Sequence, residues 1–159
     1  MEIKNIYGET YLKVHTKFRE GCRGIIVCDN KILLSHEETT DFWSTPGGGL
    51  EPGETLEECL IREIEEETGY IIKPQDYYLI LNEYYDEWKY VNNFFTCEIT
   101  GQGKVNLTET EKARNLVFKW ISVDVALEIF SKHESYKDIF KNKQGSYLRD
   151  YVALLNLHY

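Results

Sequence analysis

Three glutamates near the end of one predicted helix carry the first chemical signal in the sequence. Glu63, Glu66 and Glu67 follow the spacing i, i+3 and i+4, which places their carboxylates on one helix face within about 6 Å. Each like-charge pair costs roughly 0.2–0.5 kcal/mol, and acids near a helix C-terminus also oppose the helix dipole. A divalent cation between the carboxylates removes both penalties. Because these ligands are hard oxygens with no His or Cys among them, the pattern favours Mg²⁺ or Mn²⁺ over zinc.

The helix itself, expected over residues 55–68, has clear start and stop signals. Thr55 and Glu58 have the spacing of a capping box, and Gly69 is suited to a left-handed C-terminal cap. Three consecutive glycines, residues 47–49, come shortly before it and let the backbone approach a ligand closely. Taken separately, the glutamates could be a solvated helix face and the glycines a plain turn. Together they predict a binding site.

With residues 48–70 assembled, the segment resembles the Nudix hydrolase signature, G-x5-E-x7-R-E-U-x-E-E-x-G-U, where U is a bulky apolar residue. The residues that match its fixed positions are Gly48, Glu54, Arg62, Glu63, Ile64, Glu66, Glu67 and Gly69. The last position is Tyr70, an aromatic residue in place of the usual aliphatic one. Weaker similarity extends from about residue 23 to about residue 122.

The resemblance implies a metal-dependent pyrophosphohydrolase. Such an enzyme hydrolyses a nucleoside diphosphate linked to another moiety X, by attack of water on phosphorus. Glu63, Glu66 and Glu67 match the positions that bind the metals, Mg²⁺ or Mn²⁺, and one of them is a candidate to double as the general base. A main-chain carbonyl of the glycine turn, from Gly48 or Gly47, is a further metal ligand in the family. The alternative is a non-catalytic nucleotide-binding or regulatory module of the same fold.

Other positions receive roles from the same resemblance. Arg62 matches the residue that orients a catalytic glutamate, and Glu54 the one that supports the loop and helix. A simple surface ion pair of Arg62 with Glu58 or Glu66 stays open. The base is not fixed either, because some family members take it from a later loop, here represented by Glu109 and Glu111.

The substrate-binding candidates are spread along the chain. They are Arg23, Gly47, Glu54 and Glu111, with Arg19 as a second basic residue that could contact a phosphate. Either arginine could equally form a surface ion pair. Aromatic residues that could stack on a base, or pack in the core, are Phe42, Tyr84, Tyr85, Trp88 and Tyr90. No motif outside the signature identifies X or the base.

The expected fold is mixed α/β (α+β), a Nudix-type α/β/α sandwich with a mixed central sheet, formed by a single domain over residues 1–159. Strands and helices intermingle without regular alternation, which favours a mixed sheet with helices against it. The expected strands are residues 3–7, 11–14, 24–28, 31–35, 43–46, 77–85, 91–100 and 117–121, and the further helices are residues 123–131 and 146–157. Residues 3–7 and 11–14 are expected to form a hairpin around Gly8.

Charge and cysteine content limit the kinds of binding partner and the cellular compartment that we expect. The net charge is −9, and residues 51–67 alone contribute −7 from eight Glu and one Arg. An acidic chain disfavours nonspecific nucleic-acid binding, so cations are expected to mediate binding of an anionic nucleotide. The four cysteines have no C-x-x-C spacing and no apolar run is long enough to span a membrane, which predicts a cytoplasmic protein with reduced thiols. Whether two copies form a homodimer is left open.

Overall fold

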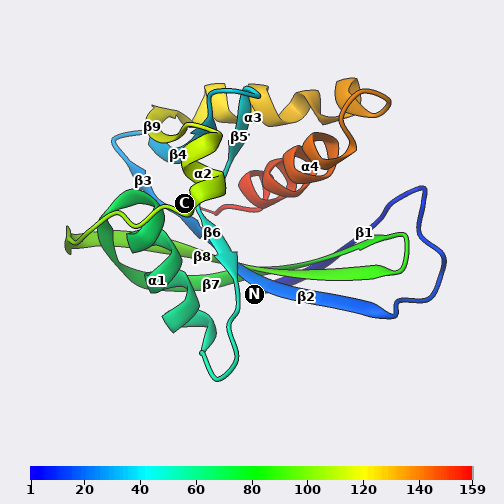
Figure 1. Cartoon of the computed structure of the whole chain (residues 1–159), viewed down its shortest axis with the longest axis horizontal. Helices are drawn as coiled ribbons and strands as arrows, with labels where there is room; N and C mark the ends of the chain where they lie inside the picture. The colour runs from blue at the N-terminus through cyan, green and yellow to red at the C-terminus, as the bar shows by residue number, and fades with distance from the viewer. Residues whose placement is uncertain (159) are drawn as a thin grey trace.

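A computed structural model describes residues 1–158 of the chain as two β-sheets flanked by helices (Figure 1). The strands are β1 (Glu2–Tyr7), β2 (Lys17–Ile25), β3 (Val27–Cys28), β4 (Lys31–Glu37), β5 (Phe42–Ser44), β6 (Gly47–Gly49), β7 (Tyr70–Tyr85), β8 (Trp88–Gln102) and β9 (Leu116–Ser122). The helices are α1 (Leu56–Thr68), α2 (Glu109–Ala113), α3 (Val123–Ser131), the 3₁₀ helix η1 (Lys132–Tyr136) and α4 (Lys141–Leu155).

The larger sheet has the strand order β1-β7-β8-β2-β6 and is mixed. β1 runs parallel to β7 and β2 parallel to β8, whereas β7 and β8 form an antiparallel hairpin that is the longest feature of the fold. The short glycine strand β6 pairs antiparallel with β2 at the sheet edge. In the smaller sheet β4 pairs with β3, β5 and β9.

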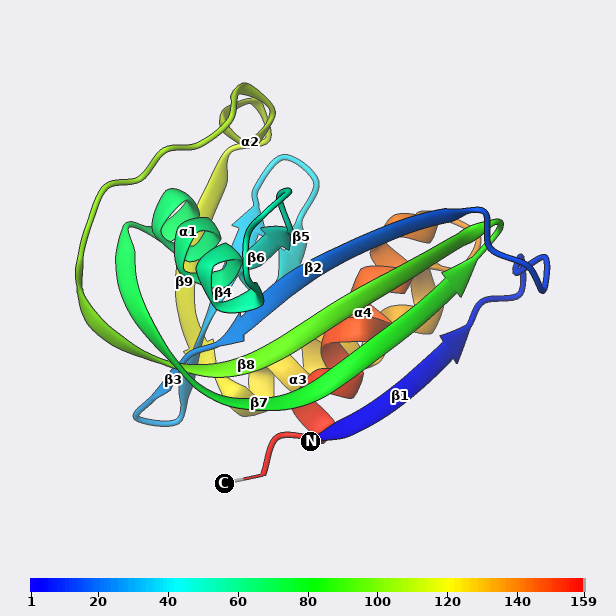
Figure 2. The ribbon, with the colours of Figure 1, turned by 90° about the horizontal axis from the view of Figure 1, so that it is seen from below.

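Helices cover both faces of the larger sheet. Helix α1 packs on one face, where Leu60 and Ile64 join a buried cluster with Cys22 and Phe95. Helices α3 and α4 lie on the other face, where the core is built around residues that include Leu79, Leu81, Phe94, Phe130 and Tyr147. Figures 1 and 2 show the two layers on opposite sides of the strands. The expected mixed sheet between helices is confirmed.

The helix that carries the glutamates begins and ends as its sequence predicts. The Thr55 hydroxyl accepts from the Glu58 amide at 3.2 Å, and the Glu58 carboxylate accepts from the Thr55 amide at 2.8 Å. Gly69 ends the helix with a left-handed φ of 79°, and its amide donates to the Glu65 carbonyl. Both ends are therefore fixed by local hydrogen bonds.

The expected N-terminal hairpin is wrong. β1 pairs with β7, and residues 11–14 form no strand. The amides of Gly8, Leu12 and Thr16 donate instead to carbonyls of the turn that joins β7 and β8 (Tyr84, Asp86 and Glu87). The N-terminal residues therefore pair with the distant β7–β8 hairpin, and not with each other around Gly8 as expected.

Several element boundaries also differ. β5 ends at Ser44, two residues before the expected end. β7 begins at Tyr70, seven residues before the expected start, because it continues directly from the cap of α1. α4 begins at Lys141, five residues early, where the buried Lys143 donates through Nζ to the Asp41 carbonyl at 2.8 Å.

Within residues 1–158 no helix is long and apolar enough to cross a membrane.

Candidate active site

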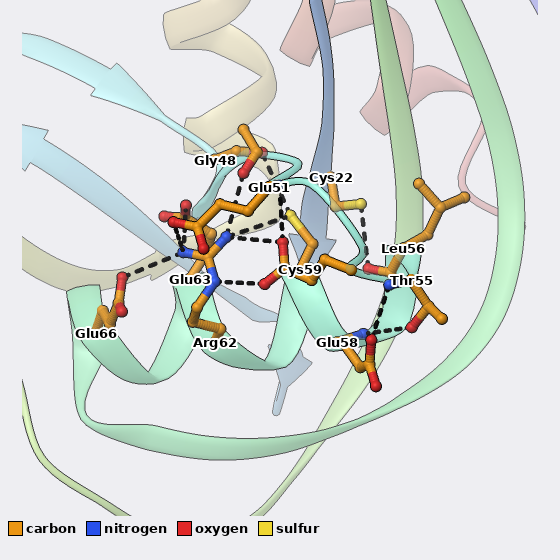
Figure 3. Close-up of polar contacts among 12 residues, drawn as sticks. Cys22, Gly48, Glu51, Thr55, Leu56, Glu58, Cys59, Arg62, Glu63 and Glu66 are labelled. Carbon is orange, nitrogen blue, oxygen red and sulfur yellow. Dashed lines mark hydrogen bonds and ion pairs between the residues drawn. The ribbon is translucent and has the colours of Figure 1, made fainter.

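Arg62 is the centre of a network that ties the loop before α1 to the helix (Figure 3). Its Nε and Nη2 both donate to the Glu54 carboxylate, and Nη2 also donates to the Gly49 carbonyl at 3.2 Å. Its Nη1 donates to Glu63 at 2.8 Å and to Glu66 at 3.4 Å. The bidentate bond to Arg62 lowers the pKa of Glu54 to about 2. This geometry differs from the surface pair left open above, because the Arg62 side chain is only partly exposed and donates to four groups.

Glu67 lies apart from the Arg62 network. Its carboxylate accepts from the Gly47 amide at 3.1 Å. Loss of hydration raises the pKa of Glu67 to about 8, and the charges of Glu63 and Glu111 act in the same direction. The charge of Arg23 and the Gly47 amide oppose the shift. A carboxyl group with this raised pKa is one that a nearby cation would stabilise strongly in its ionised form.

Gly48 is placed where a side chain would collide with the site. A Cβ added at Gly48 would stand 2.3 Å from the carboxyl carbon of Glu63. Desolvation raises the pKa of Glu63, against the lowering effect of its bond to Arg62. Glycine at this position therefore lets the Glu63 carboxylate lie directly against the backbone of β6.

The donor set is chemically suited to a hard cation, although the side chains are held by other partners. Among residues 1–158 no group of three or more His, Cys, Asp or Glu stands in a position to hold a metal ion. Glu63 and Glu66 face Arg62, whereas Glu67 faces the Gly47 amide. Three carboxylates beside a glycine backbone are nevertheless the oxygen ligands that Mg²⁺ and Mn²⁺ take.

A cavity of about 690 Å³ opens beside Gly48 and Gly49, on the α4 side of the sheet. Its walls carry more cationic than anionic side chains, in contrast to the acidic chain as a whole. The basic residues are Arg19, Arg23, Arg114, Lys141 and Arg149, and the acidic ones are Glu37, Glu83 and Asp86. A concave, partly aromatic space with converging charged groups is the usual form of a small-molecule site.

Both arginines proposed from the sequence line this cavity. Arg23 donates through Nη1 to the Thr45 carbonyl at 2.9 Å, and burial lowers its pKa to about 10. The guanidinium of Arg19 lies over Gly49, with Nη2 3.4 Å from where a Cβ of that glycine would stand. The structure thus brings both basic side chains beside the glycine strand.

Of the aromatic candidates, Phe42, Tyr85 and Tyr90 line the cavity. Tyr84 and Trp88 do not belong to its lining. Tyr84 stacks on Tyr7 with ring centroids 4.8 Å apart, and Trp88 stacks on Tyr90 at 5.4 Å. These two aromatic residues pack against other rings at the far end of the long hairpin.

The loop candidates Glu109 and Glu111 lie in the short helix α2, which the sequence prediction missed. Glu111 accepts from the Thr108 amide at 2.8 Å while Thr108 accepts from Glu111, so Glu111 is part of a second capping box. Glu109 pairs with Lys112 at 3.1 Å. Glu111 is close enough to Glu67 for its charge to raise the pKa of that carboxyl.

The sequence prediction also missed a buried group of polar residues opposite the glycine strand. Asp150 is fully buried and accepts from the Thr45 amide at 2.9 Å and from its hydroxyl at 3.0 Å. Arg149 donates to Asp150 through Nε and Nη2 and reaches the cavity wall. An arginine and an aspartate within the otherwise apolar residues 147–155 were the signal that could have revealed this group.

Comparison with known proteins identifies the family of the domain. The family model of the NUDIX domain matches residues 19–142. The ADP-ribose pyrophosphatase of Methanocaldococcus jannaschii is 40% identical over 84 residues, 43% of this chain and 50% of that protein. The RNA pyrophosphohydrolase of Wolbachia (subsp. Brugia malayi) is 31% identical over 141 residues, 76% of this chain and 86% of that protein. The chain spans about half the length of the archaeal relative and of a Bacillus subtilis relative.

A solved structure shares the fold over most of its length. The NUDIX hydrolase from Nitrosomonas europaea superimposes with a TM-score of 0.61 at 25% identity, covering 90% of this chain and 97% of that one. The matched family model spans the glycine strand, α1 and the strands that form the cavity floor. On the motif, the fold and these matches, the chain belongs to the Nudix family.

Proposed function

We propose that this protein hydrolyses the diphosphate linkage of a nucleoside diphosphate joined to another moiety, with Mg²⁺ or Mn²⁺ as cofactor. The observation that carries the proposal is the position of the Arg62 network. It holds Glu63 against the backbone of Gly48, at the edge of a cavity lined by cationic side chains. Carboxylates for a cation and arginines for phosphates thus meet along one short strand.

Glu63, Glu66 and Glu67, with the main-chain carbonyl of Gly48, are the residues that would hold the cation. When bound there, a divalent cation lowers the pKa of water and neutralises phosphate charge. Arg62 is a positioning residue in this scheme, because it fixes the Glu63 carboxylate, and Glu54 in turn fixes Arg62. The proton of the attacking water would be taken by one of these three glutamates, or by Glu109 or Glu111 of α2.

The phosphates of the substrate would lie between the glutamates and the arginines. Arg23 and Arg19 line the cavity beside Gly48 and Gly49, so both can donate to phosphate oxygens next to the proposed cation site. An acidic protein can bind an anion in this way because the local charge, rather than the net charge, acts at short range. Gly47 contributes by fixing Glu67 through its amide.

The alternative is a module that binds a nucleotide without hydrolysing it. The chain keeps every acidic position of the Nudix signature, and these residues converge on the glycine strand, which supports catalysis.

All four cysteines are free, which supports a reducing compartment, the cytoplasm.

A substrate panel tests the proposal. The purified protein is incubated with ADP-ribose, dinucleoside polyphosphates, nucleotide sugars, nucleoside triphosphates and 5′-triphosphorylated RNA, with Mg²⁺ or Mn²⁺ and with excess EDTA. We expect cleavage of at least one compound at a diphosphate bond, lost in EDTA and in Glu67→Gln. Cleavage that persists unchanged in EDTA would contradict the cation, and no cleavage of any compound would support the binding module.

A further inference from the structure

The cavity floor carries a buried polar pair that the proposed hydrolysis does not use. In the register of the sheet, Glu83 lies opposite Tyr90, and Tyr90 opposite Arg19. The next row along the strands joins Asn92 to Gly21, and Gly21 to Gly49. Paired residues in neighbouring strands share one face. Glu83 and Asn92 are therefore diagonal neighbours on the face that α4 covers.

The same register explains why the floor is hollow. Gly21 and Gly49 stand side by side in the middle row, so neither β2 nor β6 places a side chain there. The cavity runs from Gly48 and Gly49, beside the proposed cation site, to Glu83 and Asn92. A nucleotide with its phosphates beside the glycine strand would therefore extend its nucleoside toward this pair.

Glu83 and Asn92 keep unused acceptors. Glu83 is 4% exposed and Asn92 9%, and Nδ2 of Asn92 donates to Oε2 of Glu83 at 2.6 Å. Among the hydrogen bonds of residues 1–158, none involves Oε1 of Glu83 or Oδ1 of Asn92. Neither oxygen is a fully buried atom without a partner, and both residues line the cavity. Arg149 donates to Asp150 through Nε and Nη2. Its Nη1 is therefore the remaining donor of this residue, which lines the same cavity.

Two neighbouring acceptors and one donor have a specific complement among the nucleobases. Guanine presents two adjacent N–H donors, N1–H and the 2-amino group, followed by the O6 acceptor. Hypoxanthine lacks the 2-amino donor, adenine presents one donor and one acceptor, and cytosine and uracil each present a single donor. A base that leaves one of these acceptors without a donor loses binding affinity, so the unmatched bases are penalised.

Aromatic walls favour a base over a ribose diol at this position. Tyr85 of β7, Tyr90 of β8, Phe42 of β5 and Phe140 before α4 line the cavity. The flat π-face of a base stacks favourably on aromatic rings. A ribose would satisfy the acceptors through its hydroxyls but would make no use of these rings.

We propose that Glu83 and Asn92 select a guanine-type base, with Glu83 accepting from its N–H donors and Arg149 donating to its carbonyl oxygen. The inference rests on the proposed function for the placement of the phosphates beside Gly48 and Gly49. It assigns Glu83, Asn92 and Arg149 to substrate specificity and not to the hydrolytic step.

Binding of nucleoside monophosphates in EDTA tests the inference apart from hydrolysis. Calorimetric titrations compare GMP, IMP, AMP, CMP and ribose 5-phosphate with the wild-type protein. We expect GMP to bind at least tenfold more tightly than the other four, with IMP losing affinity through the missing 2-amino donor. Equal affinity for the four nucleotides, or ribose 5-phosphate as tight as GMP, would overturn the inference.

Variants separate base selection from general binding. Glu83→Gln replaces one acceptor by a donor, so GMP affinity should fall at least tenfold while AMP affinity is kept or rises. Glu98→Gln, an exposed glutamate on β8, is the matched control and should change neither. Asn92→Ala is the second variant, in case Glu83→Gln unfolds. It should also reduce the ratio of GMP affinity to AMP affinity. A GMP preference that both variants retain would refute the assignment.

The two failures remain distinguishable. Selective GMP binding without turnover of any diphosphate would leave the base site standing and reject the hydrolase. Turnover of diphosphates without any preference between bases would reject the base site alone.

Discussion

Arg62 and Glu54 form a bidentate ion pair across eight residues of chain, with both Nε and Nη2 of the arginine on one carboxylate. Because Glu54 lies in the loop and Arg62 in α1, the pair fixes the glycine strand against the helix. The remaining nitrogen of Arg62, Nη1, is then directed at Glu63. One guanidinium thereby couples the geometry of the loop to that of a proposed cation ligand.

Arg62→Lys tests this coupling. Lysine keeps the charge but cannot make the planar, two-pronged contact, so Glu63 should lose its fixed position. We expect turnover to fall tenfold or more, roughly 1.4 kcal/mol of barrier, while the fold persists in circular dichroism. A lysine variant with wild-type turnover would show that Arg62 does not act in the site. If Arg62 formed only a surface ion pair, the substitution would lower the stability by only about 0.5 kcal/mol.

Glu66→Gln should separate activity from stability. Glu66 shares one helix face with Glu63 and makes only a long contact to Arg62, at 3.4 Å. Removing its charge relieves like-charge repulsion near the helix end. We expect most activity to be lost, with the melting temperature in EDTA unchanged or slightly higher. A large drop in that temperature would mean that Glu66 is a structural hydrogen-bond partner.

Gly48→Ala tests whether Glu63 must lie against the backbone. The added Cβ would stand 2.3 Å from the Glu63 carboxyl carbon, and the flexible side chain can move away. Turnover should therefore fall at least tenfold with only a small change in stability. Gly101→Ala is the control, because its Cβ would meet Ile71 at an ordinary 3.7 Å. Equal turnover in both variants would show that the close approach at Gly48 is not needed.

The stability of the protein should depend on pH through Glu83. Burial raises the pKa of Glu83 to about 7 from an ordinary value of 4.5, with Asp150 acting in the same direction and Arg149 and Arg23 opposing. Between these pH values the native state holds a proton that the unfolded chain has lost, so the free energy of unfolding falls as pH rises. The Glu83→Gln variant lacks this titrating carboxyl group and therefore lacks this contribution to the pH dependence.

Urea unfolding in EDTA measures this effect. The free energy of unfolding of the wild type relative to Glu83→Gln should be lower at pH 8 than at pH 5. A difference that stays constant between the two pH values would show that Glu83 titrates normally in the folded protein.

Local signals in the sequence were sufficient for α1 and the residues it carries. The capping box at Thr55 and the cap at Gly69 fix the helix register, and a helix in register places Arg62 beside Glu63 and Glu66. The contacts of Arg62 with Glu54 and Gly49 follow because the connecting loop is short. Short sequence separation made this part of the site predictable.

The other side of the cavity depends on contacts that no local pattern encodes. Asp150 reaches Thr45 across 105 residues of chain, and Arg149 faces the cavity only because α4 packs on the sheet. Glu83 lies within an expected strand, but only the pairing of β7 with β8 brings it beside Asn92. Glu111 could be foreseen near the site, but its capping role in α2 was overlooked.

The most direct test of the account is to follow the attacking oxygen. A compound cleaved in the panel is hydrolysed in ¹⁸O-labelled water with Mg²⁺, and the products are examined by ³¹P NMR. The account predicts one ¹⁸O on a single product phosphoryl group, and no cleavage in EDTA or with Glu67→Gln. Products free of ¹⁸O on phosphorus, or labelling that continues in EDTA, would contradict cation-dependent attack of water on the diphosphate.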